Sequence, residues 1–190
     1  MLDAAAQLFG SDGYAATTIA GVAAAAGVSV ETVYKSFGGK PGLVRALRDQ
    51  ALEGEGPVPA EQRSDDLQTH ERDARKVIRG WAALALEVAP RVAPIHLLVR
   101  AAAAVDPESA LLQQEIEADR LLRMTHNART LEQGGHLRQG ITLQEAADVL
   151  FTYSSPELYE LLVLSRGWSL DHYGRFIADA MIAALLRDHH

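Results

Sequence analysis

Glycines and capping residues divide the first fifty residues of this chain into short amphipathic helices. Leu2, Ala5, Ala6 and Phe9 repeat at helical spacing, and we predict that this first helix ends within the stretch Gly10–Gly13. Helices this short cannot bury an apolar face alone, so they must pack together into a small core.

Two further short helices follow, with a tight turn between them. Thr17 and Thr18 are capping residues for the second helix, and Ser29 caps the third. The stretch Ala26–Ser29 joins these helices, and Gly38–Gly39 ends the third. This spacing is typical of a helix-turn-helix motif, which we therefore predict here.

The predicted third helix has an apolar side and a polar outer face. Val33 and Phe37 lie one turn apart and face the predicted core. The opposite side of such a helix fits the major groove of DNA, where base edges display donors and acceptors. The candidate base-contacting residues are Val30, Glu31, Thr32, Lys35 and Ser36. The candidate phosphate contacts are Thr17, Thr18, Tyr34, Lys40 and the helix N-terminus at Ser29.

The remainder of the chain also has helical periodicity. A fourth helix is predicted from Lys40 to about Leu52, and a linker from Glu53 to Asp66, where glycine, proline and charge accumulate. Further helices are predicted over about 67–89, 94–105, 107–133, 142–166 with a break at Pro156, and 169–187. No segment alternates like a strand. We therefore predict an all-α fold with an N-terminal three-helix helix-turn-helix domain, residues 1–50, and a larger C-terminal helical domain, residues 51–190.

Composition excludes several kinds of protein. The chain has no cysteine, so it has neither disulfides nor thiolate metal sites, and no metal or cofactor is expected. No apolar run approaches the ~20 residues of a membrane helix, and the first residues lack the basic region of a signal peptide. We expect a cytoplasmic protein without a membrane partner. The terminal pair His189–His190 is consistent with a tag remnant and is not expected to belong to a functional site.

Charge is unevenly distributed along the chain. Residues 1–50 hold four basic and four acidic groups, so the whole net charge of −7 falls on residues 51–190. The N-terminal part is therefore the less acidic part, which favours it as the part that meets a polyanion.

Residues 2–47 resemble the N-terminal domain of the TetR/AcrR family of transcriptional regulators, and residues 155–186 are similar to endings seen in that family. The N-terminal resemblance rests on Phe9, Gly13–Tyr14, Thr17–Thr18, Ala23, Ala26–Ser29, Val33–Tyr34, Phe37 and Lys40 taken together. The resemblance implies a homodimer that binds a near-palindromic double-stranded DNA operator and releases it when a small-molecule effector binds. It also implies repression rather than activation.

The C-terminal part carries candidates for the dimer interface and for the effector site. The last two predicted helices are unusually apolar, and a two-fold four-helix interface would bury that surface. The candidate interface residues are Leu150, Leu158, Leu161, Leu162, Tyr173, Phe176, Ile177, Ala180, Met181 and Ala184. The candidate effector-binding residues are Trp81, His96, Arg100, Arg123, His126 and Tyr153. An apolar lining favours a hydrophobic effector, and each candidate also has a purely structural interpretation, such as a helix ion pair between Asp119 and Arg123.

The sequence also bears on two other classes of function. An enzyme is disfavoured because the chain has no nucleophile elbow, phosphate loop or His-Glu-x-x-His motif. A helical module that binds a small molecule or a protein, without sequence-specific DNA binding, stays open. It is favoured by Gly21 and the four alanines of the second helix, by the neutral head, and by the absence of a basic arm before the first helix.

Overall fold

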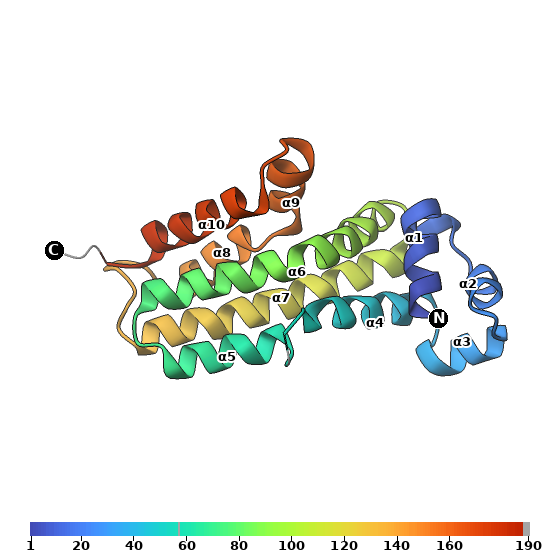
Figure 1. Cartoon of the computed structure of the whole chain (residues 1–190), viewed down its shortest axis with the longest axis horizontal. Coiled ribbons are helices and arrows are strands. Elements are labelled where there is room, and N and C mark those ends of the chain that lie inside the picture. The colour runs from blue at the N-terminus through green and yellow to red at the C-terminus, as the bar shows by residue number, and fades with distance from the viewer. Residues whose placement is uncertain (57, 188–190) are drawn as a thin grey trace.

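The computed structural model describes residues 1–56 and 58–187, which form an elongated, almost entirely helical molecule (Figure 1). The terminal pair His189–His190 and residue 57 of the predicted linker lie outside the described residues. The elements are α1 (Leu2–Ala16), α2 (Ile19–Ala26), α3 (Val30–Phe37), α4 (Lys40–Glu53), α5 (Ala60–His70), α6 (Ala74–Ala103), α7 (Pro107–Gln133), α8 (Leu143–Tyr153), α9 (Pro156–Tyr159), the π-helical segment η1 (Glu160–Ser165) and α10 (Leu170–Leu185). Within the described residues, the extended pairing is limited to one isolated bridge between Leu137 and Leu186. The all-α prediction is confirmed.

Short-range capping builds the helix-turn-helix as predicted. The Thr18 hydroxyl accepts a hydrogen bond from the Gly21 N–H, and the Ser29 hydroxyl accepts one from the Thr32 N–H. Gly27 and Gly38 end α2 and α3 in the left-handed conformation, with φ of 66° and 73°, which only glycine adopts without strain. Together these caps fix where α3 begins and ends.

The first helix breaks within the predicted stretch Gly10–Gly13 and then resumes as far as Ala16. It passes through Gly10 and breaks only at Gly13, whose φ of 79° and ψ of 170° are non-helical. The break turns the chain so that Tyr14 enters the core, with its ring 5.7 Å from that of Phe9. Gly10 causes no break because its weak helix propensity is outweighed by the packing of the helix around it.

The core of the N-terminal helices extends into the rest of the molecule. Phe9, Val22, Val33 and their apolar neighbours form one buried cluster. That cluster also contains Val99 and Ala102 from the end of α6, with Leu112 and Ile116 from the start of α7. We call α1, α2, α3 and the first turns of α4 the head; it packs directly against the ends of α6 and α7.

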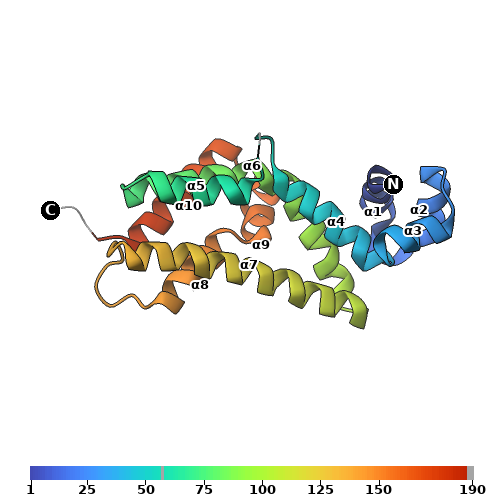
Figure 2. The same cartoon turned by 90° about the horizontal axis from the view of Figure 1, so that it is seen from below.

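A second core lies at the other end of the molecule. Side chains of α6, α7, α8 and α10 surround it, among them Ile78, Leu131, Leu150 and Ile177. Figure 2 shows α5 and α6 on one side of this region and α7 and α8 on the other. The long helices α6 and α7 therefore contribute to both cores.

The region before α6 differs from the prediction. Residues 60–66, expected in a linker, form most of α5, and a break at Glu71–Asp73 separates α5 from α6. The charged residues of α5 are not a solvated linker, because the Arg63 guanidinium donates to both oxygens of Glu87 at 2.8 and 2.6 Å. This pairing and a hydrogen bond from the Glu55 N–H to the Glu87 carboxylate hold α5 beside α6, and the Arg63 guanidinium lowers the pKa of Glu87 to about 2.

The predicted break near residue 90 is wrong. Helix α6 continues through Pro90 and Pro94, both of which are exposed. The prolines are four residues apart and so lie on one face, where water can solvate the carbonyl groups that lose their N–H partners. The buried Val92 and Ala93 on the other face keep the helix packed.

By length and composition, α6 resembles a membrane-crossing helix more than we expected. An 18-residue window within Ala74–Ala103 reaches a mean hydropathy of 1.5. In this fold the helix lies among α4, α5, α7 and α10, and its apolar side chains pack against them or line an internal cavity. We therefore interpret its apolar character as that of a core helix.

Candidate DNA-binding helix and internal cavity

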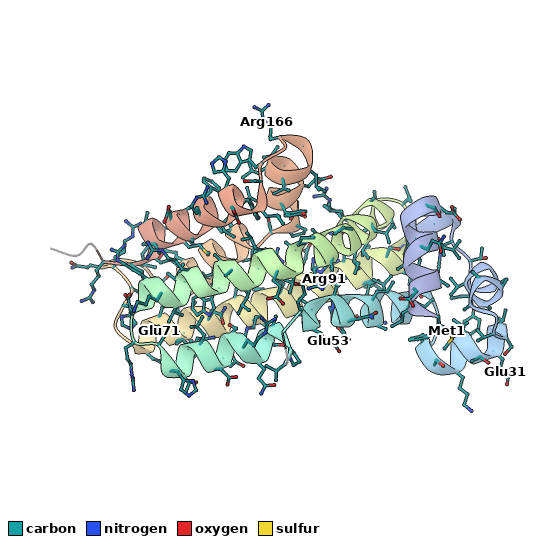
Figure 3. The ribbon with its side chains drawn as sticks, viewed as in Figure 1. Met1, Glu31, Glu53, Glu71, Arg91 and Arg166 are labelled. Atoms are coloured by element: carbon teal, nitrogen blue, oxygen red, sulfur yellow. The ribbon has the colours of Figure 1, made fainter. Side chains whose placement is uncertain are left out.

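Helix α3 lies at the end of the molecule furthest from the C-terminus and presents a polar face to solvent (Figure 1). On the inner side of α3, Val33 is fully buried and Phe37 is partly buried. On the outer side Tyr34 is 52% exposed, and Figure 3 shows Glu31 pointing away from the protein. The exposed residues of this face are Val30, Glu31, Thr32, Tyr34, Lys35 and Ser36.

The N-terminus of α3 is closed by a local hydrogen-bond network. Ser29 Oγ lies 2.8 Å from Thr32 Oγ1 and accepts from the Thr32 N–H at 3.1 Å. Both residues are exposed, so they are accessible from outside while they also fix the start of the helix. Thr18 does the same for α2, where its exposed hydroxyl accepts from Gly21 N–H at 3.0 Å.

Two of the candidate phosphate contacts are engaged within the head. Thr17 is only 2% exposed, and its hydroxyl donates to the Gly13 carbonyl at 2.8 Å. The expectation that this hydroxyl faces a phosphate is therefore corrected: it ties the start of α2 to the break in α1. The Lys40 ammonium donates to the Tyr14 carbonyl at 2.9 Å and lies 4.4 Å from the centre of the Tyr14 ring.

The two arginines of α4 are paired with carboxylates of α7. Arg45 donates to both oxygens of Glu115, at 2.7 and 2.6 Å, and Arg48 Nη1 lies 3.0 Å from Asp119 Oδ2. These ion pairs connect the helix that leaves the head to the C-terminal helices. They also compensate two of the four basic groups in residues 1–50, which leaves Lys35 as the exposed cation of α3.

A cavity of about 750 Å³, partly open to solvent and called the internal cavity below, lies between α4, α5, α6, α7, α8, α9 and α10. Its volume is within the range of small-molecule binding sites. Along α6 the lining residues recur every three or four positions: Trp81, Leu84, Ala85, Val88, Ala89, Val92, Ala93 and His96. This stripe is apolar except at its two ends, and the lining also includes Met124, Ile177 and Met181 from the helices opposite.

The polar ends of the stripe are buried and lack a hydrogen-bond partner among the described residues. Trp81 is 7% exposed with its Nε1 unsatisfied, and His96 Nε2 is likewise unsatisfied. Burial, reinforced by the nearby charge of Arg120, lowers the pKa of His96 to about 4, so the imidazole is neutral at pH 7. Buried polar atoms are normally hydrogen-bonded, so these two atoms are candidates to receive a partner from a bound molecule.

Arg120 is a cavity residue that the sequence analysis missed. Its Nη1 donates to the Phe151 carbonyl at 2.5 Å and to Ser154 Oγ at 3.2 Å, and its guanidinium lies 3.5 Å from the Phe151 ring centre. Burial lowers its pKa, and no carboxylate among the described residues forms an ion pair with it. Its position four residues after the buried Ile116 places it on the inward face of α7, and that spacing was the available signal.

The predicted effector residues fall into two groups. Trp81, His96, Arg123, His126 and Tyr153 line the cavity. Arg100 does not: its guanidinium pairs with Glu157 at 3.1 Å and Glu160 at 2.8 Å on the outside of the protein, so it is removed from the effector set.

Arg123 also has partners other than the one expected. It pairs with Glu61 and Asp65 of α5, at 3.2 and 2.7 Å, rather than with Asp119 of its own helix. The exposed His126 lies 3.4 Å from the same Asp65. Arg123 therefore joins α5 to α7 at the edge of the cavity.

A second cavity, of about 720 Å³, lies where α1 and α4 meet α6. Phe9, Leu47 and Leu98 contribute to its apolar lining, and Arg91 reaches it from α6. It separates part of the head from the C-terminal helices.

The predicted dimer interface is divided between surface and core. Leu150, Tyr173, Ile177 and Met181 are buried in the protomer, so they lie too deep to contribute surface to an interface. Their apolar character serves the protomer's own core. The candidates that retain exposed surface are Leu158, Leu161, Leu162, Phe176, Ala180 and Ala184, and the exposed Leu164 joins them.

Comparison with known proteins is consistent with this arrangement. Residues 1–47 match the family described as bacterial regulatory proteins of the tetR family. The HTH-type transcriptional regulator YvkB of Bacillus subtilis (strain 168) is 43% identical over 67 residues, a match that covers 35% of this chain and 35% of YvkB. The sequence likeness is thus concentrated in a part of each chain.

Solved structures extend the likeness to the whole fold. The regulator FadR of Bacillus subtilis, in complex with stearoyl-CoA, superposes with a TM-score of 0.75 at 16% identity and covers 96% of each chain. The SmeT–triclosan complex superposes with a TM-score of 0.73 at 26% identity, over 98% of this chain and 90% of SmeT. The head and the C-terminal helices are arranged as in these proteins.

Proposed function

We propose that this chain is a TetR-family transcriptional regulator rather than an enzyme, and that it binds a near-palindromic DNA operator as a homodimer and releases it when a small apolar molecule enters the internal cavity. The observation that carries the proposal is the exposed polar face of α3, held between two caps at one end of the molecule. A helix presented in this way fits the major groove of DNA. We further propose repression in the cytoplasm as its mode of action.

In this proposal α3 reads the bases and its surroundings hold the backbone. Val30, Glu31, Thr32, Lys35 and Ser36 face the groove. The hydroxyl groups of Thr18, Ser29 and Tyr34 donate hydrogen bonds to phosphate oxygens. Lys40 contributes charge while it stays bonded to the Tyr14 carbonyl, and Thr17 acts only by fixing the start of α2.

Two copies are proposed to pair through the outer faces of α9, η1 and α10. The exposed Leu161, Leu164 and Phe176 support this, since a protomer gains by covering such side chains. A two-fold axis there would set the two heads on one face of the DNA at successive major grooves, which is why the operator is expected to be a near-palindrome.

The proposed response to a ligand is a population shift. Arg48 and Asp119 both line the cavity and also connect α4 of the head to α7. A ligand that favours one position of α4 over another changes the spacing of the two heads, by no more than its difference in affinity for the two states. FadR and SmeT, which share the fold, are solved with stearoyl-CoA and triclosan respectively, and this supports a small-molecule effector.

A second candidate is a helical binding module without sequence-specific DNA binding. It is favoured by the pairing of Arg45 and Arg48 with α7, which leaves the head with little uncompensated positive charge.

Selection from a random duplex library at several salt concentrations separates the two candidates. Enrichment of a palindrome, with affinity that falls steeply as salt rises, is expected of the dimeric regulator. Failure to enrich any sequence even at low salt would favour the second candidate.

A further inference from the structure

The charged side chains that line the internal cavity are almost all paired in salt bridges. Arg48 pairs with Asp119 and Asp49, and Arg123 pairs with Asp65 and Glu61. Arg129 lines the cavity but is exposed to solvent. Arg120 is therefore the cation in the lining that is partly withdrawn from water and has no carboxylate partner among the described residues.

The position of Arg120 is defined by its hydrogen bonds. The Phe151 carbonyl and Ser154 Oγ both accept from Nη1, so the other guanidinium nitrogens, Nη2 and Nε, remain available. An arginine held in this way can donate two parallel hydrogen bonds to a carboxylate. Glu157 and Glu117 act on the Arg120 charge from a distance, but neither pairs with it and burial still lowers its pKa. A bound anion in direct contact would therefore offset part of the free-energy cost of burying this cation.

His96 lies in the same part of the cavity as Arg120. Among the charged groups near His96, Arg120 has the largest effect on the pKa of the imidazole. His96 Nε2 is buried without a hydrogen-bond partner among the described residues. A neutral imidazole offers a further hydrogen bond to an acceptor bound by Arg120.

The cavity extends away from this pair along an apolar path. His96 and Trp81 are fifteen positions apart on α6, which corresponds to roughly 20 Å along the helix. The α6 residues that line the cavity between them are alanine, leucine and valine: Leu84, Ala85, Val88, Ala89, Val92 and Ala93. The cavity thus has a cationic end beside the head and a long apolar body that reaches Trp81.

We propose that the effector is an amphipathic carboxylate, whose carboxylate binds Arg120 and His96 while its apolar tail lies along α6 toward Trp81. This inference rests on the proposed function only in calling the bound molecule an effector. The binding itself is a property of the isolated protein. The carboxylate would sit beside Arg48 and Asp119, at the junction of α4 and α7.

The test uses the full chain with Trp168→Phe, which leaves Trp81 as the only tryptophan of the two in the sequence. Trp168 stacks on His172, with ring centroids 4.0 Å apart, and does not line the cavity. Decanoate, decanol and decylamine are titrated at pH 7 and followed by Trp81 fluorescence and calorimetry. Decanoate is expected to bind at least about tenfold more tightly than decanol, and decylamine most weakly.

Variants of two arginines on α7 distinguish a specific carboxylate site at Arg120 from a general effect of positive charge. Arg120→Gln is expected to weaken decanoate binding about tenfold or more and to change decanol binding less than about threefold. Arg129→Gln removes the same charge from the exposed rim and is expected to change neither by more than about threefold. Arg120→Lys keeps the charge without the paired donors and is expected to be intermediate.

Chain length tests the tail independently. From octanoate to hexadecanoate, each added CH₂ is expected to tighten binding about fourfold, and Trp81 emission is expected to shift only for the longest chains, whose extended length approaches the distance from His96 to Trp81.

Several results would overturn the proposal. They are tighter binding of decanol or decylamine than of decanoate, an equal loss for decanoate and decanol in Arg120→Gln, or no decanoate binding by the Trp168→Phe protein when its melting temperature matches that of the unsubstituted chain. DNA selection with the same protein tells this failure from that of the proposed function. If a palindrome is enriched but decanoate does not bind, only the inference about the carboxylate is contradicted. If decanoate binds but no DNA sequence is enriched, only the proposed regulator function is contradicted.

Discussion

Arg48 of α4 and Asp119 of α7 form an ion pair at the boundary between the head and the large cavity, with Nη1 3.0 Å from Oδ2. Three residues before Arg48 in α4, Arg45 pairs with Glu115 at 2.6 Å. The position of α4 relative to α7 is therefore set in part by two polar contacts, one of which a cavity ligand would touch.

Removing both carboxylates should uncouple the head from the cavity. In Glu115→Gln/Asp119→Asn, we expect operator release by a cavity ligand to fall at least severalfold, while the thermal stability of the protein changes little because exposed ion pairs contribute only ~0–1 kcal/mol. Operator binding with and without ligand measures this. Glu71→Gln, which removes the distant Lys76–Glu71 pair, is the matched control and should leave release unchanged. Full release in the double variant would show that the ion pairs do not carry the coupling.

Tyr34→Phe should weaken binding to every DNA sequence by a similar amount. The exposed hydroxyl is proposed to donate to a phosphate, so its loss should cost about 1 kcal/mol, the value of one hydrogen bond, and leave the preferred sequence unaltered. Affinities for the selected operator and for unrelated duplexes are the measurement. Ser11→Ala, which removes an exposed hydroxyl of α1, serves as control. A changed order of preferred sequences would mean that Tyr34 reads bases.

Two glycines in the head should respond oppositely to alanine. A Cβ placed on Gly42 would lie 1.6 Å from the Phe37 carbonyl oxygen, so Gly42→Ala must push α4 away from α3. A Cβ on Gly10 meets nothing within 4 Å, and Gly10→Ala should stabilise α1 by about 0.5–1 kcal/mol. Urea unfolding measures both. We expect Gly42→Ala to destabilise the head by several kcal/mol or to unfold it, and equal stability of the two variants would contradict the close approach of α3 and α4.

The buried His96 should make stability depend on pH. Its pKa is about 4 in the folded protein and about 6.5 when unfolded, so between these values the unfolded chain binds more protons. Stability should therefore be unaffected by His96 above pH 6.5 and fall by about 3 kcal/mol as pH decreases through this window to 4. Unfolding free energies of the parent and of His96→Asn at pH 7 and pH 4.5 measure the difference. A parallel loss in both proteins would show that His96 titrates normally.

Local signals in the sequence predicted most of the head. Thr18 and Ser29 are short-range caps and Gly27 is a left-handed turn, so each depends on residues within four positions and can be identified without the fold. Thr17 could not be placed in this way, because its hydroxyl turns inward only once Gly13 has broken α1.

The errors in the C-terminal part arise from long-range contacts. Residues 60–66 have the composition of a linker, and they are helical because Arg63 meets Glu87 and Asp65 meets Arg123. The prolines of α6 predicted an end that the packing of Val92 and Ala93 prevents. Arg120 was missed because a lone arginine next to Asp119 on α7 looks like a surface residue until its partners are known.

The ends of α6 and α7 supply Val99, Ala102, Leu112 and Ile116 to the core of the head. A cut at residue 50 would pass through α4 and leave those four side chains without the partners that cover them. The head is thus not a self-contained cassette that can be transplanted onto another sensor. A working hybrid would have to exchange these positions together with residues 1–47, or redesign the seam between them.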